Sequence, residues 1–181
     1  MKTSGLIIAL FACALKAQAQ GTIQFYATLT GADEVPPNSD PTIARGTFTL
    51  DGNILNFLVD VPIVTFSSLS GFIQGPALPG STAPVIFDLG APVPHSGSQG
   101  DPPFYRFASP QTGPFGAGPF TLTADQITQL QGSLWYVNIT SAMQPEGQLR
   151  GQIFQVPEPN TVALIGSGAT IWLLRKRRRP K

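Results

Sequence analysis

The chain has 181 residues, of which 19 are glycine and 18 are proline, and only 12% are charged. This composition excludes a coiled coil, a helical bundle, a collagen and an acidic disordered chain, and it favours a domain of strands and turns. The formal charge of +1 averages segregated parts, because residues 20–155 carry nine acidic residues against three arginines, a balance of −6. A domain of that sign repels phosphate backbones, and we therefore expect no nucleic-acid partner.

The N-terminus has the pattern of an export signal. An apolar run at residues 6–15 follows an N-terminal lysine and precedes a small-x-small sequence that ends at Ala19. This order predicts a signal peptide at residues 1–19, cleaved by signal peptidase between Ala19 and Gln20. The alternatives are an N-terminal helix of the fold and a bacterial lipobox, in which Cys13 would become the acylated N-terminus. Loss of Cys13, the single cysteine, would exclude disulfides and cysteine metal sites.

The first half of the domain predicts strands. Apolar and polar side chains alternate over residues 22–29, as in a half-buried strand. Residues 31–41 are turn-rich and acidic, and we expect a loop there. The clearest hairpin joins residues 47–50 to residues 53–61 through the Asp-Gly pair between them, which favours a type I′ turn. One face of this hairpin is expected to carry Phe48, Leu50, Leu55, Phe57, Val59 and Val61.

A glycine- and proline-rich segment follows. Residues 84–89 predict another short strand. Residues 89–119 then contain six glycines and seven prolines. Because few backbone ladders survive that composition, we expect a long, partly ordered loop there, with one short strand around residues 104–107.

The last part of the domain predicts one helix and two closing strands. Thr123 lies three residues before Gln126, which is a capping-box pattern, and Gly132 is the expected end of the helix. The closing strands are expected at residues 133–140 and 147–155. Six to eight antiparallel strands with one short helix predict an all-β fold, an antiparallel β-sandwich of two sheets.

The C-terminal segment, residues 156–181, joins a proline-rich motif, an apolar stretch and a basic cluster. We predict a transmembrane helix at residues 159–174, whose apolar part spans ~21 Å of a ~30 Å hydrocarbon core. Snorkelling arginines in the basic tail, residues 175–181, would extend this reach and should remain cytoplasmic, which leaves the domain outside. The motif is Val156, Pro157, Glu158 and Pro159, and the cluster is Arg175, Lys176, Arg177, Arg178 and Arg179.

This order of Pro-Glu-Pro, short apolar helix and arginine-rich end resembles the PEP-CTERM sorting signal. The resemblance implies a Gram-negative bacterium that makes exopolysaccharide, and processing near residues 157–159 by an exosortase, a membrane protease-transferase. The implied partners are the secretion machinery, signal peptidase and exosortase, with exopolysaccharide or outer-surface components as candidate ligands. The expected location is an inner-membrane intermediate with its domain in the periplasm, followed by the cell surface or extracellular matrix.

Three blocks of the domain carry a second resemblance: residues 25–37, residues 136–139 and residues 149–153. They make residues 20–155 similar to the CHRD domain, which is named for repeats in chordin and is widespread in bacterial surface proteins. The resemblance implies an immunoglobulin-like or superoxide-dismutase-like Greek-key β-sandwich and no general enzymatic activity. The residues expected to serve the shared fold are Asp33, Glu34, Pro36, Tyr136, Asn138, Arg150, Gly151 and Gln152.

The chain departs from that family where its members commonly carry histidines. A His-Ile-His-Gly-Pro block is replaced here by Phe-Ile-Gln-Gly-Pro at residues 72–76, and the histidine usual after Tyr-Val-Asn-Ile is Thr140. Because copper and zinc favour imidazole ligands, we expect no metal and no cofactor. The single histidine, His95, is expected to be a solvated loop residue.

Three groups of charged residues offer weaker candidate sites. Asp60 and Asp88 each end an expected strand, and a glycosidase-like carboxylate pair is one hypothesis for them. Arg150 lies in a strand of few charges, and we expect it to pair with Asp33, Glu34 or a backbone carbonyl. The third group places oxygens in one loop but lacks EF-hand spacing, so a solvated acidic loop is favoured over a calcium site. Its members are Asp33, Glu34, Asn38 and Asp40.

The sequence as a whole predicts an exported, non-enzymatic surface or matrix domain with a structural or adhesive role. Its support is the pair of export signals and the low charge of the domain. Two alternatives stay open. One is a calcium- or polysaccharide-binding module, and the other is a degenerate superoxide-dismutase-like or carbohydrate-active enzyme.

Overall fold

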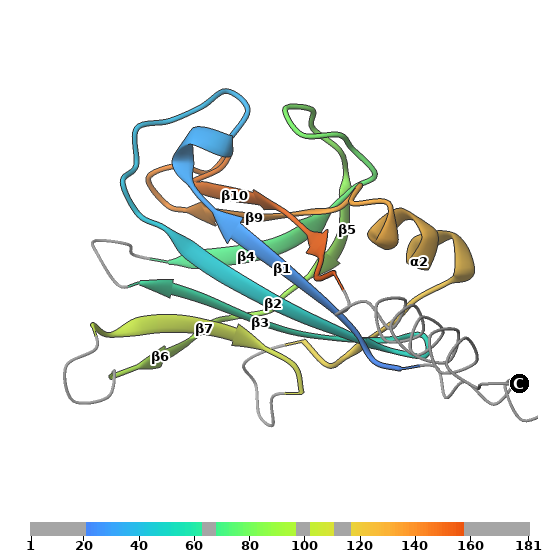
Figure 1. The fold of residues 1–181 in the computed structure, drawn as a ribbon. Coiled ribbons are helices and arrows are strands. Elements are labelled where there is room, and N and C mark those ends of the chain that lie inside the picture. The colour runs from blue at the N-terminus through green and yellow to red at the C-terminus, as the bar shows by residue number, and fades with distance from the viewer. Residues whose placement is uncertain (1–20, 63–67, 97–101, 111–116, 158–181) are drawn as a thin grey trace, which may run out of the picture.

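The computed structural model describes residues 21–62, 68–96, 102–110 and 117–157. The predicted signal peptide, transmembrane helix and basic tail lie outside these residues. Within the described ranges, no helix is long and apolar enough to cross a membrane. The described chain folds into two antiparallel sheets with one short α-helix, which confirms the prediction of an all-β fold (Figure 1).

The larger sheet has seven strands, in the order β11-β1-β2-β3-β7-β6, with β8 also paired to β3. Its strands are β1 (Ile23–Leu29), β2 (Ala44–Asp51), β3 (Ile54–Pro62), β6 (Val93–His95), β7 (Phe104–Ala108), β8 (Phe120–Thr121) and β11 (Phe154–Gln155). The smaller sheet has the order β10-β9-β4-β5. Its strands are β4 (Leu69–Gln74), β5 (Val85–Asp88), β9 (Tyr136–Ser141) and β10 (Leu149–Gln152). A 3-10 turn, η2 (Gly31–Asp33), and the helix α2 (Ala124–Gln131) complete the fold.

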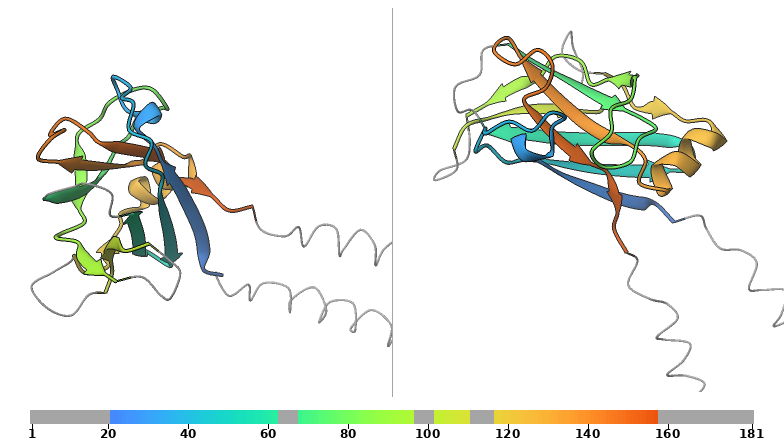
Figure 2. Two further views of the ribbon diagram at one scale, coloured as in Figure 1. Left: turned by 90° about the vertical axis from the view of Figure 1, so that its left-hand side faces the viewer. Right: turned by 90° about the horizontal axis from the view of Figure 1, so that it is seen from above.

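Inward-facing side chains of both sheets form one hydrophobic core. Phe25, Phe48 and Phe107 from the larger sheet, and Ile73 and Ile139 from the smaller one, are each at most 1% exposed. Full burial of a side chain of this size stabilises the fold by about 1.5–3 kcal/mol. The core therefore joins the two sheets into one unit. The chain enters β1 and leaves β11 at the same side of the domain (Figure 2).

The predicted hairpin forms β2 and β3, and its six predicted inward side chains are all buried. Its turn differs from the prediction. Asp51 pairs with Ile54 at the end of the ladder, so the two turn residues are Gly52 and Asn53. Of these two, Gly52 alone has a positive φ, of 59°. That pattern is typical of a type II′ turn, in which glycine holds the first central position, and not of type I′.

The predicted helix is confirmed as α2. The side chain of Thr123 accepts a hydrogen bond from the backbone N–H of Gln126, and the side chain of Gln126 accepts one from the backbone N–H of Thr123. This reciprocal capping box satisfies two N–H groups at the start of the helix. Gly132 caps its end, and the fully buried Leu130 packs the helix against the core.

Three strands, β4, β6 and β8, were not predicted from the sequence. β4 lies at the centre of the smaller sheet, and its Gly71 leaves room for Phe107 and Ile139 to pack closely. β6 falls inside the segment predicted as a loop, next to β7, which contains the predicted strand at residues 104–107. Pro94 fits in β6 because β6 is the edge strand. His95 therefore lies in a strand, where its ring stacks on Phe104 with centroids 5.2 Å apart.

The two predicted closing strands also differ from the structure. The first begins at Tyr136, because Ser133 has a φ of 55° and ends the turn after α2. The second divides at Ile153 into β10, in the smaller sheet, and β11, in the larger sheet. The N–H of Ile153 donates to the carbonyl of Trp135 at 2.8 Å, where the chain passes between the sheets. The polar side chains of this segment, Gln148, Arg150 and Gln152, are buried.

Candidate functional site

Four polar or aromatic side chains line the face of the smaller sheet that points away from the core. In the register of β9 and β10, Arg150 lies opposite Asn138, and Gln152 lies opposite Tyr136. Val137, which alternates with them along β9, belongs to the hydrophobic core. All four are at most 9% exposed, so other segments of the chain must cover them. We call these four residues the polar face.

The loop between β4 and β5, residues 75–84, covers one part of the polar face (Figure 1). Its backbone is held there by polar-face side chains, not by a strand ladder. Such hydrogen bonds satisfy buried polar groups at both ends, and losing one partner costs about 1–3 kcal/mol. Four bonds do this. Tyr136 Oη accepts from the N–H of Ala83 at 3.0 Å and donates to the carbonyl of Ala83 at 3.3 Å. Arg150 Nη2 donates to the carbonyl of Ser81 at 2.5 Å, and Gln152 Nε2 donates to the carbonyl of Ala77 at 3.0 Å.

Arg150 is the central cation of this arrangement. Its guanidinium carbon lies 3.6 Å from the centroid of the Tyr136 ring, a cation–π contact, and the residue is only 3% exposed. Of the three partners expected from the sequence, the structure shows the backbone carbonyl. Within the described part of the chain, the one ion pair closer than 4.0 Å joins Arg106 to Asp60 instead.

The loop between β1 and β2, residues 30–43, is attached beside the polar face. Asn38 Nδ2 donates to the carbonyls of Gly147 at 3.3 Å and Gln148 at 3.0 Å. Asp40 accepts from the N–H of Thr42 at 2.8 Å and from the side-chain amide of Gln148. Burial by itself would raise the pKa of Asp40, but the hydrogen bonds from Thr42 and Gln148 lower it below its ordinary value. Two chain segments about a hundred residues apart are thereby joined.

Glu34 is a buried acidic residue beside the polar face. It is 5% exposed, and its Oε1 is buried without a hydrogen-bond partner among the described residues. Burial raises its pKa to about 7, although the charge of Arg150 and a backbone hydrogen bond from Val35 act in the opposite direction. The carboxyl group lies against the backbone of Gly147, where a Cβ atom would come within 2.4 Å of Oε2.

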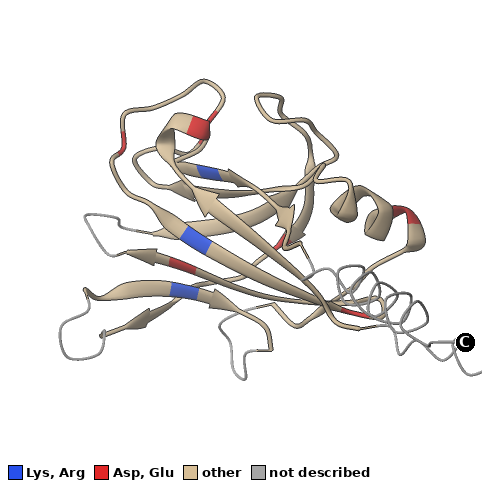
Figure 3. Ribbon diagram, viewed as in Figure 1, with Lys and Arg blue, Asp and Glu red and all other residues tan. Residues whose placement is uncertain are grey.

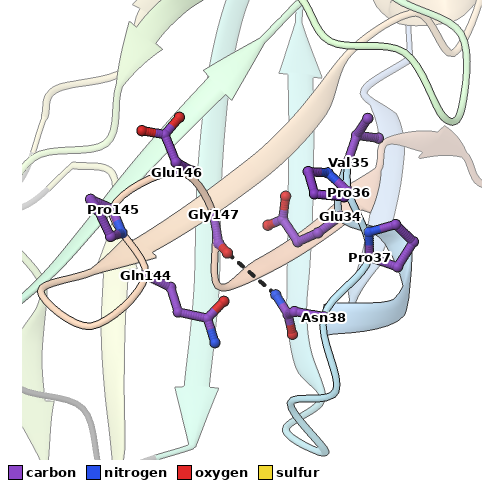
Figure 4. A pocket seen from close by; sticks show the side chains of 9 residues that line it. All are labelled: Glu34, Val35, Pro36, Pro37, Asn38, Gln144, Pro145, Glu146 and Gly147. Atoms are coloured by element: carbon purple, nitrogen blue, oxygen red, sulfur yellow. Dashed lines mark hydrogen bonds between the residues drawn. The ribbon is translucent and has the colours of Figure 1, made fainter.

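A pocket of about 220 Å³ lies between Glu34 and the turn before β10 (Figure 4). Exposed Pro36 and the rings of Pro37 and Pro145 form much of its lining, with Gln144, Glu146 and Asn38 at its polar side. Figure 4 shows the carboxyl group of Glu34 directed toward Gly147 and that of Glu146 directed away from it.

The four residues considered for calcium do not share one set of free oxygens. Asn38 and Asp40 make the hydrogen bonds that attach the loop. Asp33 accepts from the hydroxyl of Thr30 at 2.7 Å, at the start of η2, and Glu34 faces Gly147. Among the residues that the structure describes, no group of three or more His, Cys, Asp or Glu side chains is arranged to hold a metal ion.

The two candidate acids of a glycosidase-like pair have separate partners. Asp60 accepts two bonds of 2.7 Å from Arg106 on the neighbouring strand β7, and the resulting ion pair holds the pKa of Arg106 above its ordinary value. Asp88 accepts from the N–H of Gly90 at 2.8 Å. Charged residues are sparse over the whole described domain (Figure 3).

The positions where the family commonly has histidine lie in the smaller sheet, where the side chain of Gln74 accepts a hydrogen bond from that of Asn138 at 3.4 Å.

The predicted processing residues fall largely outside the described ranges. Val156 and Pro157 are described, and the N–H of Val156 donates to the carbonyl of Gln24 at 2.8 Å. Both sides of the predicted signal-peptide bond, Glu158, Pro159 and the basic cluster lie outside. These residues stay sequence predictions.

The protein is an all-β domain in which the four polar-face residues lie on the adjacent strands β9 and β10. A family model for the CHRD domain matches residues 25–153, and a model for the PEP-CTERM protein-sorting motif matches residues 155–179. The chain therefore belongs to the CHRD domain family and carries a PEP-CTERM sorting motif, as both resemblances predicted. No curated protein and no solved structure matched the chain. The comparison with immunoglobulin-like or superoxide-dismutase-like Greek keys stays a prediction.

Arg150 and Glu34 were predicted from the sequence as residues of this region, but the segments that cover them were not. Gln148 and the 75–84 loop were not singled out, and no local pattern marks them, because their partners lie 108 and 69 residues away along the chain. One available signal was the excess of polar residues in a closing strand. Because loops cover the outer face of β10, polar residues in this strand are not exposed.

Proposed function

We propose that this protein is an exported, non-enzymatic domain that is delivered by the exosortase system to the cell surface or extracellular matrix, where its role is structural or adhesive. The PEP-CTERM motif supports export through that system and handling at the membrane. The CHRD domain is consistent with an extracellular location.

The observation that carries this proposal is the direct junction between the folded domain and the sorting motif. β11 ends at Gln155, and the match to the motif begins at the same residue. Residues 156–158 would then be the whole connection to the predicted membrane helix, and three residues reach at most about 11 Å. An inserted tail would hold the domain beside the membrane until exosortase releases or transfers it.

The polar side chains beside the smaller sheet are used to hold the domain itself together. Tyr136, Arg150 and Gln152 hold the 75–84 loop through hydrogen bonds of 2.5–3.0 Å. Asn38 holds the 30–43 loop in a similar way. Tyr136, Arg150 and Gln152, which lie in the blocks that resemble the family, thus keep the 75–84 loop in place on the outside of the smaller sheet.

Deletion of residues 157–181 tests the delivery. We expect the full-length protein to appear at the surface or in the medium with an N-terminus at Gln20 and a C-terminus near Pro157, as measured by intact mass. The truncated protein should instead stay in the periplasm. A variant with serine at the five positions 175–179 is a second test, because it keeps the apolar stretch and removes its cytoplasmic anchor, and we expect it to fail to reach the surface as well. An unchanged surface location of the truncated protein, or a wild-type tail retained to Lys181, would contradict the proposal.

A further inference from the structure

We propose that a second pocket, formed where the chain passes from β10 to β11, binds a sugar ring of a neutral saccharide chain. This inference rests on the proposed adhesive role and names the ligand class for it. The pocket has a volume of about 300 Å³, at the lower end of the range for small-molecule sites. It combines two exposed aromatic rings with polar side chains from β1, η2 and β10.

The aromatic wall consists of Tyr26 and Phe154. They are direct partners in the register of β1 and β11, and their ring centroids lie 6.0 Å apart with the planes tilted by 39°. Tyr26 is 45% exposed and Phe154 is 41% exposed, so each presents a ring face or edge to solvent. Aromatic rings offer large apolar area at a small entropic cost, and the apolar C–H face of a sugar ring is a matching surface.

The polar wall is held rigidly by the fold. Gln152 Nε2 donates to the carbonyls of Ala77 at 3.0 Å and Ser133 at 2.7 Å, which fixes the amide and leaves Oε1 as an acceptor. Arg150 is fixed by its contacts with Ser81 and Tyr136, and its guanidinium has further N–H donors. Pre-ordered groups lose little conformational entropy when a ligand binds.

Two more polar groups complete this wall. Asp33 is exposed, and the hydroxyl of Thr30 donates to its Oδ2 at 2.7 Å, which orients the carboxylate and leaves Oδ1 for a ligand. Thr28 adds a hydroxyl two residues along β1 from Tyr26. Sugar hydroxyls both donate and accept, so a wall that mixes carboxylate, amide, guanidinium and hydroxyl groups suits neighbouring hydroxyls on one ring.

The charges favour a neutral saccharide over an acidic one. Asp33 and Arg150 carry opposite charges, so the lining of the pocket has no net charge. The domain around it carries nine acidic residues against three arginines. Its field therefore repels a polyanion such as a uronate chain.

Isothermal titration calorimetry tests the site on the full-length protein, in a detergent without a sugar headgroup. The probes are cellohexaose, laminarihexaose and mannohexaose, with an alginate hexamer as the acidic comparison. We expect at least one neutral hexamer to bind, and Tyr26→Ala and Asp33→Asn each to weaken that binding about tenfold or more. Tyr26→Phe keeps the ring and should bind within about twofold of wild type. Met143→Ala, a 76% exposed residue outside the pocket, should also bind normally.

Three results would overturn the site: no neutral hexamer binds, the alginate hexamer alone binds, or a folded Tyr26→Ala variant binds as well as wild type. Circular dichroism checks that each variant is folded. Because binding is measured on purified protein, it does not depend on delivery. A protein that reaches the surface and binds no neutral hexamer would refute the saccharide site while leaving the proposed delivery intact.

Discussion

Replacement of Glu34 by glutamine should change how the stability of the domain depends on pH. Glu34 is 5% exposed, and one oxygen of its carboxyl group has no hydrogen-bond partner in the described structure. Burial favours its neutral form and raises its pKa from the ordinary 4.5 to about 7. Arg150 and a backbone hydrogen bond from Val35 favour the charged form but do not outweigh burial, and the charge of Asp33 raises the pKa further. Glutamine has nearly the same shape and no charge at any pH.

The direction of the pH effect on stability depends on whether the folded or the unfolded state holds the proton. Between pH 4.5 and about 7, the folded protein keeps a proton on Glu34 that the unfolded chain releases. The stabilisation is therefore complete below pH 4.5 and is lost as the pH rises through about 7. Each pH unit in this window changes the free energy of unfolding by about 1.4 kcal/mol, so the whole window is worth on the order of 3 kcal/mol.

The assay compares urea unfolding of wild type and Glu34→Gln at pH 5 and pH 8, followed by circular dichroism. We expect similar free energies of unfolding at pH 5, and at pH 8 we expect the variant to be more stable by up to about 3 kcal/mol. Glu146→Gln is the matched control, because this exposed residue lines the same pocket with its carboxyl group turned away. A variant that is less stable than wild type at pH 8 would refute the reasoning, since Arg150 would then stabilise a charged Glu34.

Two further predictions concern packing and metals. Gly151→Ala should destabilise the domain by about 1–3 kcal/mol, because its Cβ would lie 2.3 Å from the backbone oxygen of Thr28. Gly118→Ala, which meets no atom within 4 Å, should change the free energy of unfolding by less than about 0.5 kcal/mol; equal effects of the two would contradict the close approach of β10 to β1. Millimolar calcium should leave the melting temperature unchanged, and purified protein should contain no stoichiometric copper or zinc by elemental analysis. A melting temperature raised by several degrees would instead favour a calcium-binding module, and a stoichiometric metal would favour the enzyme hypothesis.

The sequence by itself determined the elements whose signals are local. The strict alternation of apolar and polar side chains over residues 22–29 predicted β1. The apolar positions of β2 and β3 predicted which face of the hairpin is buried. The Thr123–Gln126 pair predicted the start of α2, because both halves of a capping box lie within four residues. The family resemblances also depended on short contiguous blocks, and both were confirmed.

The tertiary structure decided what depends on distant partners. The sequence predicted one strand over residues 147–155, but this segment divides between two sheets, and its polar side chains Gln148, Arg150 and Gln152 are buried. Arg150 meets a carbonyl 69 residues away, and Glu34 faces Gly147. A two-residue period in the sequence shows only that successive side chains point to opposite faces of a strand. Which of those faces is covered is set by loops whose own positions follow from hydrogen bonds and packing across the whole chain.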